Sequence, residues 1–299
     1  MNSAVQRPSR FYRGSFWKWG MAAARHLPVR LSYFVLKRLA LAYWRLAKRR
    51  REVVIRNLAP ALGGSEAEAI IASRRLFEQF AVKLVDLWRF ESGRPVDSLF
   101  TELTGWQNFT RAHARGAGVL LITPHLGNWE FGGPLLVSRG VKLHVITLLE
   151  PGDHFTELRQ AARARWGIET LVIGNDAFAF VDIIKRLQSG AVVALLIDRP
   201  PLARATTVEL FGKSFLASAA AAELGRASGC SLVPVYLPRT SSGYAAHILP
   251  EVSYDRAALS SKEVRAVLTQ QIMRVFENPI RQHITQWYHF VPIWPKREL

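Results

Sequence analysis

The sequence predicts an α/β fold: a mainly parallel central sheet flanked by helices, with an N-terminal helical membrane-associating module. From residue 117 onward, short apolar runs typical of strands alternate with longer stretches at helical spacing. The chain has 299 residues and 49% hydrophobic content, enough for one large core or two small ones. The simplest partition is a basic amphipathic segment, residues 1–51, followed by one catalytic domain, residues 52–299.

The N-terminal segment carries most of the charge. Residues 1–60 hold fourteen Lys or Arg and one acid, Glu52, so this stretch contributes +13 of the formal +17. Aromatic and aliphatic residues are interspersed among the basic ones, and no window of about 20 apolar residues is free of charge. No signal peptide is recognisable. We expect helices lying at an anionic membrane surface; an ordinary helical pair packed on the catalytic domain is the alternative. Nucleic acid is disfavoured as a partner, because the charge is confined to one end and no binding motif is visible.

The remaining elements follow in order. Ser65-Glu-Ala-Glu68 is a capping box that opens a helix over 65–91, and Gly93-Arg-Pro95 ends it. Strands are predicted at 118–123, 143–149, 170–173, 191–197, 231–237 and 244–250. Helices are predicted near 129–138, 154–166, 176–188, 216–228 and 260–277. The single cysteine, Cys230, lies in an apolar run, is interpreted as a core residue, and is compatible with a reducing cytoplasm.

The most informative motif follows the first strand of this series. The run Leu120-Leu-Ile-Thr ends at Pro124, His125 comes next, and Glu130 lies five residues later. An imidazole can take a proton from a hydroxyl near neutral pH, and a carboxylate on its other nitrogen fixes the tautomer. On one helix these side chains would be roughly 140° apart, so His125 must lie in the loop for the two to meet. No Ser, Cys or Lys nucleophile belongs to the motif, which favours a general base acting on a substrate hydroxyl.

Other interpretations of this motif remain open. His125 could be a structural histidine beside an unrelated Glu130. A zinc site is weaker still, because the spacing is not H-E-x-x-H and no other His or Cys cluster completes a ligand set. We expect no metal and no bound cofactor.

Further candidates lie around this motif and downstream of it. Asn128, within the motif, is a candidate for substrate binding. Asp198-Arg199 ends the most apolar strand, where a charged pair is either part of a site or closes the sheet. Arg159 and Arg163 could hold a phosphate or a developing oxyanion, but they lie on a predicted helix, so a solvated helix face is the favoured interpretation.

At this point the chain resembles the lipid A biosynthesis acyltransferases (lauroyl and myristoyl acyltransferases) of the lysophospholipid acyltransferase superfamily. His125 and Glu130 match the family's H-x4-[DE] motif. The strand ending at Asp198, the run Leu210-Phe211-Gly212, the stretch Gly229-Cys-Ser-Leu-Val-Pro-Val235 and the aromatic tail Gln286-Trp-Tyr-His289 follow in the family's order. The resemblance assigns Phe211 and Gly212 to substrate binding. It departs where Asp198-Arg199-Pro200 replaces Asp-Gln-Asp and Leu210 replaces Phe, changes that bear on the acceptor more than on the reaction.

The resemblance implies transfer of a fatty acyl group from an acyl carrier protein or coenzyme A thioester to a hydroxyl of a lipid or glycolipid, such as a lipid A precursor. The expected location is the cytoplasmic face of a bacterial inner membrane, with monotopic attachment. His125 and Glu130 would form the general-base dyad, and the oxyanion donors are backbone N–H groups or an arginine. Two alternatives stay open: an N-acyltransferase acting on an amine, and a non-catalytic membrane-binding protein with an acyltransferase fold.

Overall fold

The computed structural model describes residues 14–148, 155–173 and 178–295, and within these ranges the α/β prediction is confirmed. Seven strands form one sheet in the order β1-β9-β8-β2-β5-β3-β4, in which β8 and β9 are the antiparallel pair and the other neighbours are parallel. The strands are β1 (Phe100–Thr104), β2 (Val119–Thr123), β3 (Leu143–Leu148), β4 (Glu169–Ile173), β5 (Val192–Leu196), β8 (Ser231–Tyr236) and β9 (Tyr244–Ile248).

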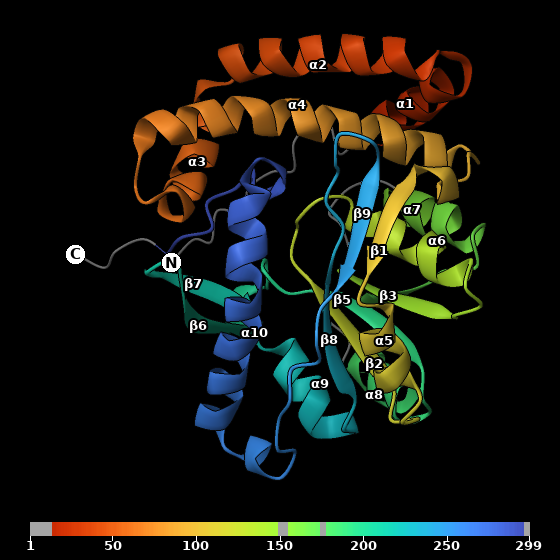
Figure 1. The fold of residues 1–299 in the computed structure, drawn as a ribbon, viewed down its shortest axis with the longest axis vertical. Helices are drawn as coiled ribbons and strands as arrows, with labels where there is room; N and C mark the ends of the chain where they lie inside the picture. Colours follow the sequence, from red (N-terminus) through yellow and green to blue (C-terminus); the bar gives the residue numbers. More distant parts are fainter. Residues whose placement is uncertain (1–13, 149–154, 174–177, 296–299) are drawn as a thin grey trace.

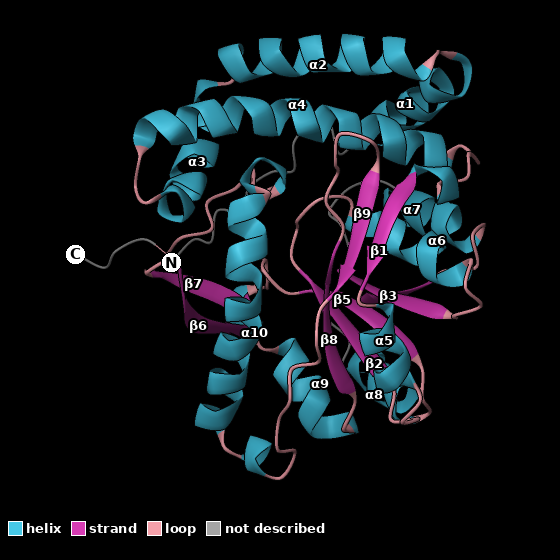
Figure 2. Cartoon of the chain, in the orientation of Figure 1, coloured by secondary structure: helices cyan, strands magenta, loops and turns pink. Residues whose placement is uncertain are grey.

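Helices cover this sheet and one of its ends (Figure 1, Figure 2). They are α1 (Gly14–His26), α2 (Val29–Leu46), α3 (Lys48–Leu58), α4 (Glu66–Glu91), α5 (Trp106–His113), α6 (Gly132–Val137), α7 (Phe155–Ala164), α8 (Phe178–Gln188), α9 (Ala220–Ser228) and α10 (Lys262–Gln282). The Ser65 hydroxyl accepts a hydrogen bond from the Glu68 N–H, so the predicted cap of α4 is confirmed. The predicted helices near 154–166 and 176–188 correspond to α7 and α8; residues 154, 176 and 177 lie outside the described ranges, as does residue 149 of the second predicted strand.

The N-terminal helices pack on α4 (Figure 1). Trp17 of α1 is buried and its indole N–H donates to Glu91 at the end of α4. Trp44 of α2 donates to the Ser73 hydroxyl over 3.1 Å. Helix α3 runs across residue 51, so the division of the chain at that point stays a prediction. Residues 1–13 of the predicted segment lie outside the described ranges.

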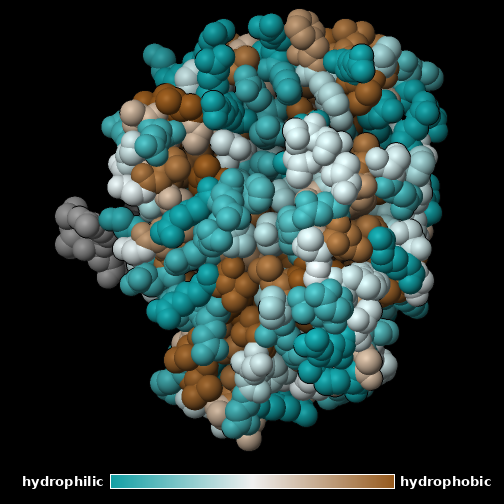
Figure 3. Space-filling view, viewed as in Figure 1, coloured by the Kyte–Doolittle hydropathy of each residue, from teal (hydrophilic) through white to brown (hydrophobic). Residues whose placement is uncertain are grey.

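The outer face of α2 is amphipathic. Leu31, Phe34, Val35 and Leu39 are exposed there, among Arg30, Lys37 and Arg38. Figure 3 shows hydrophilic and apolar side chains mixed along this edge of the molecule. Among the described helices, none combines the length and the apolar character that a membrane span requires.

Some elements differ from the expectation. An antiparallel hairpin, β6 (Ala205–Leu210) and β7 (Lys213–Ser218), occupies residues that include the predicted start of the helix at 216. The alternating side chains of β7 suit a strand that buries one face, and Phe215 and Ala217 lie in the core. The edge strand β1 and helix α5 were also not predicted. Both are short, and the polar sequence of β1 gives no buried-strand pattern.

Candidate active site

The loop after β2 places His125 at the carboxyl end of the sheet. All five residues of β2 are buried, and Pro124 ends the strand. Gly127 has φ +65°, and a Cβ there would lie 2.0 Å from the carbonyl oxygen of Leu237, so only glycine fits. The C-terminal segment fixes the loop from the other side, because the Tyr288 N–H donates to the His125 carbonyl over 2.9 Å. The backbone of the loop that carries His125 is therefore fixed on both sides.

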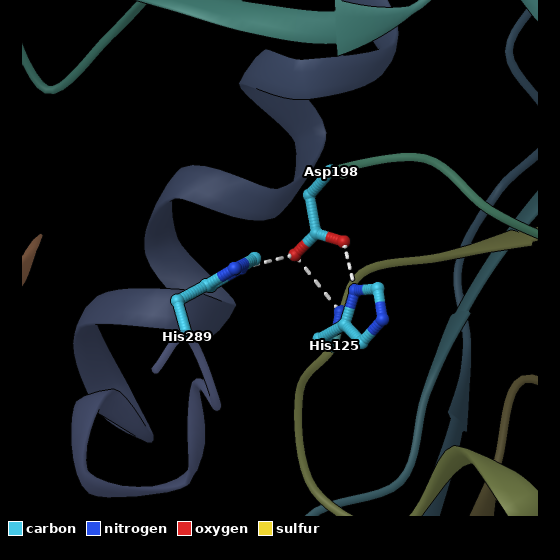
Figure 4. A group of neighbouring side chains, drawn as sticks. All are labelled: His125, Asp198 and His289. Atoms are coloured by element: carbon cyan, nitrogen blue, oxygen red, sulfur yellow. Dashed lines mark hydrogen bonds and ion pairs between the residues drawn. The ribbon is translucent and has the colours of Figure 1, made fainter. Parts of the chain in front are cut away.

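The carboxylate that binds this imidazole is Asp198, which follows β5. Strands β2 and β5 are parallel neighbours, so the residues just past their carboxyl ends meet at one edge of the sheet. His125 Nδ1 lies 2.6 Å from Oδ1 of Asp198, and the His125 backbone N–H donates to Oδ2 over 2.9 Å. Figure 4 shows the carboxylate lying between the rings of His125 and His289.

Two more donors complete the surroundings of Asp198. The indole N–H of Trp287 and Nε2 of His289 lie 2.9 Å and 2.8 Å from Oδ2. The Asp198 side chain has no exposed surface, whereas that of His125 is 15% exposed. Burial favours protonated Asp198, but His125 and His289 outweigh it and hold the pKa of this carboxyl well below its usual range.

These contacts fix the tautomer of His125. Burial lowers the pKa of its imidazole below the usual value, although Asp198 acts in the opposite direction. The ring is therefore neutral at pH 7, and Nδ1 must carry the proton because it faces an ionised carboxylate. The lone pair is then on Nε2, on the side of the ring away from Asp198 (Figure 4). A neutral Nε2 in this position can act as a general base.

The expected contact between His125 and Glu130 is corrected by the structure. Glu130 lies in a short 3₁₀ turn, Trp129–Phe131, and its carboxylate binds α7 instead. Arg163 donates through Nε over 3.1 Å and Nη2 over 2.9 Å, and Arg159 Nη2 lies 2.7 Å away. Two guanidinium groups offer this carboxylate more charge-assisted bonds than one imidazole could. The carboxylate that pairs with His125 is therefore that of Asp198.

The glutamate nevertheless belongs to a buried ion-pair network. Arg159 also binds Glu91 at the end of α4, with 2.9 Å between Nη1 and Oε1. Burial alone would raise the pKa of Glu130, but Arg159 and Arg163 hold it well below its usual range. Both arginines are buried, so their interpretation as a solvated helix face is wrong. The network joins α4, α7 and the motif loop.

A cavity of about 730 Å³ opens beside His125. Its walls are mainly apolar and aromatic, and it also reaches Glu130, Arg159, Arg163 and Arg199. Toward the outside it is bordered by Trp19 of α1 and Leu39 of α2, which are also exposed on the surface. A volume of this size with few polar groups suits an extended hydrocarbon chain better than a polar metabolite.

The remaining predicted residues lie at several distances from this cavity. Arg199 is exposed and lines it, while Asn128 is fully buried and does not. Phe211 and Gly212 form the turn of the β6–β7 hairpin, both with positive φ, and neither lines the cavity. The ring of Phe211 instead packs 6.0 Å from that of Trp287, and so supports a donor to Asp198. The substrate-binding assignments of these residues stay predictions.

Several residues of the site were not singled out from the sequence. Trp287 and His289 had been noted only as part of a matching tail, and Lys83 not at all. Lys83 could have been found, because it falls on the same stripe of α4 as Leu76, Leu87 and Phe90. A lysine on a buried stripe is rare unless it has a partner or a function.

The three residues His125, Asp198 and His289 lie close enough together to offer ligands to a metal ion. The oxygens of Asp198, however, already accept four hydrogen bonds, from the indole and backbone N–H groups as well as from the two imidazoles. This arrangement fits an oriented histidine better than a ligand set, and the expectation of no metal stays a prediction.

Comparison with known proteins shows which family this chain matches. A family model for bacterial lipid A biosynthesis acyltransferases matches residues 4–296. The chain is also similar to a phosphatidylinositol mannoside acyltransferase of Mycobacterium tuberculosis, with 25% identity over 252 residues, which is 81% of this chain and 77% of the relative. A protein of the same name from Mycolicibacterium smegmatis is 26% identical over 252 residues, covering 81% and 79%.

Proposed function

The chain belongs to the bacterial lipid A biosynthesis acyltransferase family and is an acyltransferase, and from this premise we propose that it moves a fatty acyl group from a carrier thioester to a hydroxyl of a glycolipid at a membrane surface. The observation that carries the proposal is the neutral His125, oriented by buried Asp198 at the side of an apolar cavity. The acceptor class follows the similar proteins, which are named for a glycolipid.

The proposed reaction is a direct displacement. Nε2 of His125 takes the proton of the acceptor hydroxyl while the hydroxyl oxygen attacks the carbonyl carbon of the thioester. A C–O bond forms, and the resulting tetrahedral oxyanion collapses with cleavage of the C–S bond. The imidazolium then returns its proton to the leaving thiolate, and Asp198 stabilises the charged ring in between. The acyl group never bonds to the protein.

In this scheme Glu130 is a positioning residue. Its ion pairs with Arg159 and Arg163 fasten the loop that carries His125 to α7. Breaking such a buried pair leaves the guanidinium group of Arg163 without its carboxylate and removes one carboxylate from Arg159, at a cost of about 3–5 kcal/mol. We therefore propose that Glu130 maintains the conformation of the loop and does not control the protonation state of His125.

The surface at which the cavity meets the exterior supports the proposal that the enzyme acts at a membrane. Trp19 and Leu39 are exposed and also border the cavity, and the exposed apolar side chains of α2 lie among basic ones. Such a surface can bind anionic lipid through both charge and apolar insertion. A chain entering from the bilayer would then reach His125 without crossing water.

The test uses the purified protein with palmitoyl-coenzyme A or palmitoyl acyl carrier protein as donor. Phosphatidylinositol mannoside and a lipid A precursor are offered separately in vesicles, and products are identified by mass spectrometry. We expect an acylated glycolipid whose new bond is cleaved by mild alkali, as an ester is. An alkali-stable amide would support the N-acyltransferase instead, and no transfer from either donor would contradict the proposal. Lipids from cells that overproduce the chain extend the same measurement to other acceptors.

A further inference from the structure

Lys83 of α4 is a buried amine to which the described residues offer no hydrogen-bond acceptor. Its residue is 4% exposed, and its Nζ has no hydrogen-bond partner among the described residues. The nitrogen lies over the ring of Trp129, 2.8 Å from the centroid, and 4.9 Å from the centroid of Tyr288. Burying an amine without an acceptor costs free energy, and this cost is commonly met at functional sites.

The unpaired amine belongs to the same cavity as the proposed base. Lys83, Trp129 and His125 all line it, and the Trp129 ring lies 4.9 Å from the His125 ring. One indole therefore contacts both the amine and the imidazole. The amine and the imidazole thus share one part of the cavity, where a donor could bind the oxygen of a carbonyl group attacked near Nε2.

The two buried arginines that line the cavity already bind carboxylates. Arg163 binds Glu130, and Arg159 binds both Glu130 and Glu91. Arg199 lines the cavity but is exposed to solvent, where its charge is screened. Among the described residues that line the cavity, Lys83 is thus both buried and able to donate hydrogen bonds for which it has no acceptor.

We propose that Lys83 donates to the carbonyl oxygen of the acyl donor and stabilises the oxyanion formed when the acceptor attacks. This inference rests on the proposed displacement with His125 as base. As the carbonyl carbon becomes tetrahedral, its oxygen takes up the negative charge, and the amine binds that oxygen. When the C–S bond breaks, the carbonyl re-forms and the contact weakens, so the stabilisation acts mainly in the transition state.

A single oxygen suits this site better than a phosphate group. The amine has aromatic walls beside it, and the neighbouring guanidinium groups are held by carboxylates, so no second free donor is at hand for a phosphate. Burial lowers the pKa of Lys83 well below its usual range, with Arg159 acting in the same direction and Glu130 and Asp198 in the opposite one. A negative charge appearing beside the nitrogen favours its protonated form, which strengthens the bond as the oxyanion develops.

The experiment compares Lys83→Met, which keeps length and removes the donor, with Lys83→Gln, which keeps a neutral donor. Lys185→Met is the matched control, because Lys185 is an exposed lysine of α8 that does not line the cavity. Thiol release from palmitoyl-coenzyme A is followed with and without phosphatidylinositol mannoside vesicles, and thermal unfolding is recorded for each variant. Hydrolysis without acceptor passes through the same oxyanion, so the readout does not depend on the acceptor chosen.

We expect Lys83→Met to lower kcat about 10²–10³-fold, the cost of losing one oxyanion donor, while the KM for the donor changes little. Lys83→Gln should lie between Lys83→Met and the unaltered protein. Lys83→Met should unfold at an equal or higher temperature, because a buried unpaired amine has been removed, whereas Lys185→Met should match the unaltered protein throughout. A structural lysine would instead lose stability together with activity.

Three results would overturn the assignment: an unchanged kcat in Lys83→Met, a loss confined to the KM for the acceptor, or a fall in rate explained by loss of the fold in both Lys83 variants. His125→Ala is measured alongside. If it is inactive while Lys83→Met is normal, only the role of Lys83 is wrong. If His125→Ala is also active, the proposed displacement itself fails.

Discussion

Replacing Asp198 by Asn would separate the two carboxylates that could act with His125. Asp198 accepts four hydrogen bonds, three at Oδ2 and one at Oδ1. The amide oxygen of Asn can keep the three donors at Oδ2, which leaves its NH₂ group facing Nδ1 of His125. Nδ1 must then become the acceptor, and the proton moves to Nε2. His125 would present a donor to the acceptor hydroxyl, and general-base catalysis would be lost.

The expected magnitudes follow from this count. A hydrogen bond to a charged group contributes about 1.5–3 kcal/mol and a neutral one about 0.5–1.5, so three weakened bonds and one reversed bond cost about 3–5 kcal/mol of stability. Loss of the base should lower kcat about 10²–10⁴-fold. The assay is thiol release from palmitoyl-coenzyme A with phosphatidylinositol mannoside vesicles, well below the unfolding temperature measured by circular dichroism.

His289→Gln is the matched control, because it keeps an N–H group directed at Oδ2 while changing the same buried cluster. We expect its kcat to stay within about tenfold of the unaltered protein, the range of a perturbed supporting contact. Our reasoning is refuted if Asp198→Asn keeps its rate with the fold intact. It is equally refuted if the rate of Asp198→Asn still rises with pH as His125 loses its proton, whereas the rate of Glu130→Gln no longer does.

Three further outcomes are expected. Glu130→Gln should cost about 3–5 kcal/mol in urea unfolding at pH 7, because buried Arg163 loses its carboxylate and buried Arg159 loses one of its carboxylates. Since the pKa of Glu130 is lowered in the folded state, this stability is present above about pH 4 and is lost as the pH falls further, so a gap that widened in acid would contradict it. Labelled donor alone should leave no acyl group on the protein; stoichiometric acylation of Cys230 or a serine would replace direct displacement by a two-step scheme. Sedimentation with anionic vesicles should weaken with salt and weaken further in Leu31→Ser/Phe34→Ser, whereas binding indifferent to both would assign α2 to another partner.

Point substitutions test the membrane surface better than truncation. Deleting residues 1–51 would also remove Trp17 and Tyr33, whose side chains bind Glu91 and Asp86 of α4. Loss of activity in such a deletion could therefore result either from release from the membrane or from exposure of buried residues of α4, and the experiment would not separate the two causes. Leu31 and Phe34 are exposed, and neither lines the cavity.

The sequence was most informative where one face of an element decides its structure. Strand β2 was predicted to within one residue because its five residues are all buried and Pro124 ends it. The cap of α4 could be predicted because Ser65 and Glu68 interact locally. The β6–β7 hairpin could not, because its pairing is local but the burial of Phe215, which favours a strand there, depends on contact with residues far along the chain.

The same distinction holds for the site. His125 and Asp198 were each recognised as residues at a strand's end, but their pairing requires β2 and β5 to be neighbours, which no local pattern reveals. Glu130 is closer in sequence and matches the H-x4-[DE] motif, and both features favour it as the partner of His125. In the structure its partners are Arg159 and Arg163, which were predicted to face substrate or solvent. The spacing of these arginines in the sequence does not reveal that α7 packs over the motif loop.

The most direct test of the account is the kcat of His125→Ala with the same donor and vesicles, measured beside its unfolding temperature. We predict a loss of about 10²–10⁴-fold with the fold retained, because Nε2 is the proposed proton acceptor and the cavity is otherwise unchanged. A folded His125→Ala protein that transfers acyl groups at nearly the original rate would contradict the account.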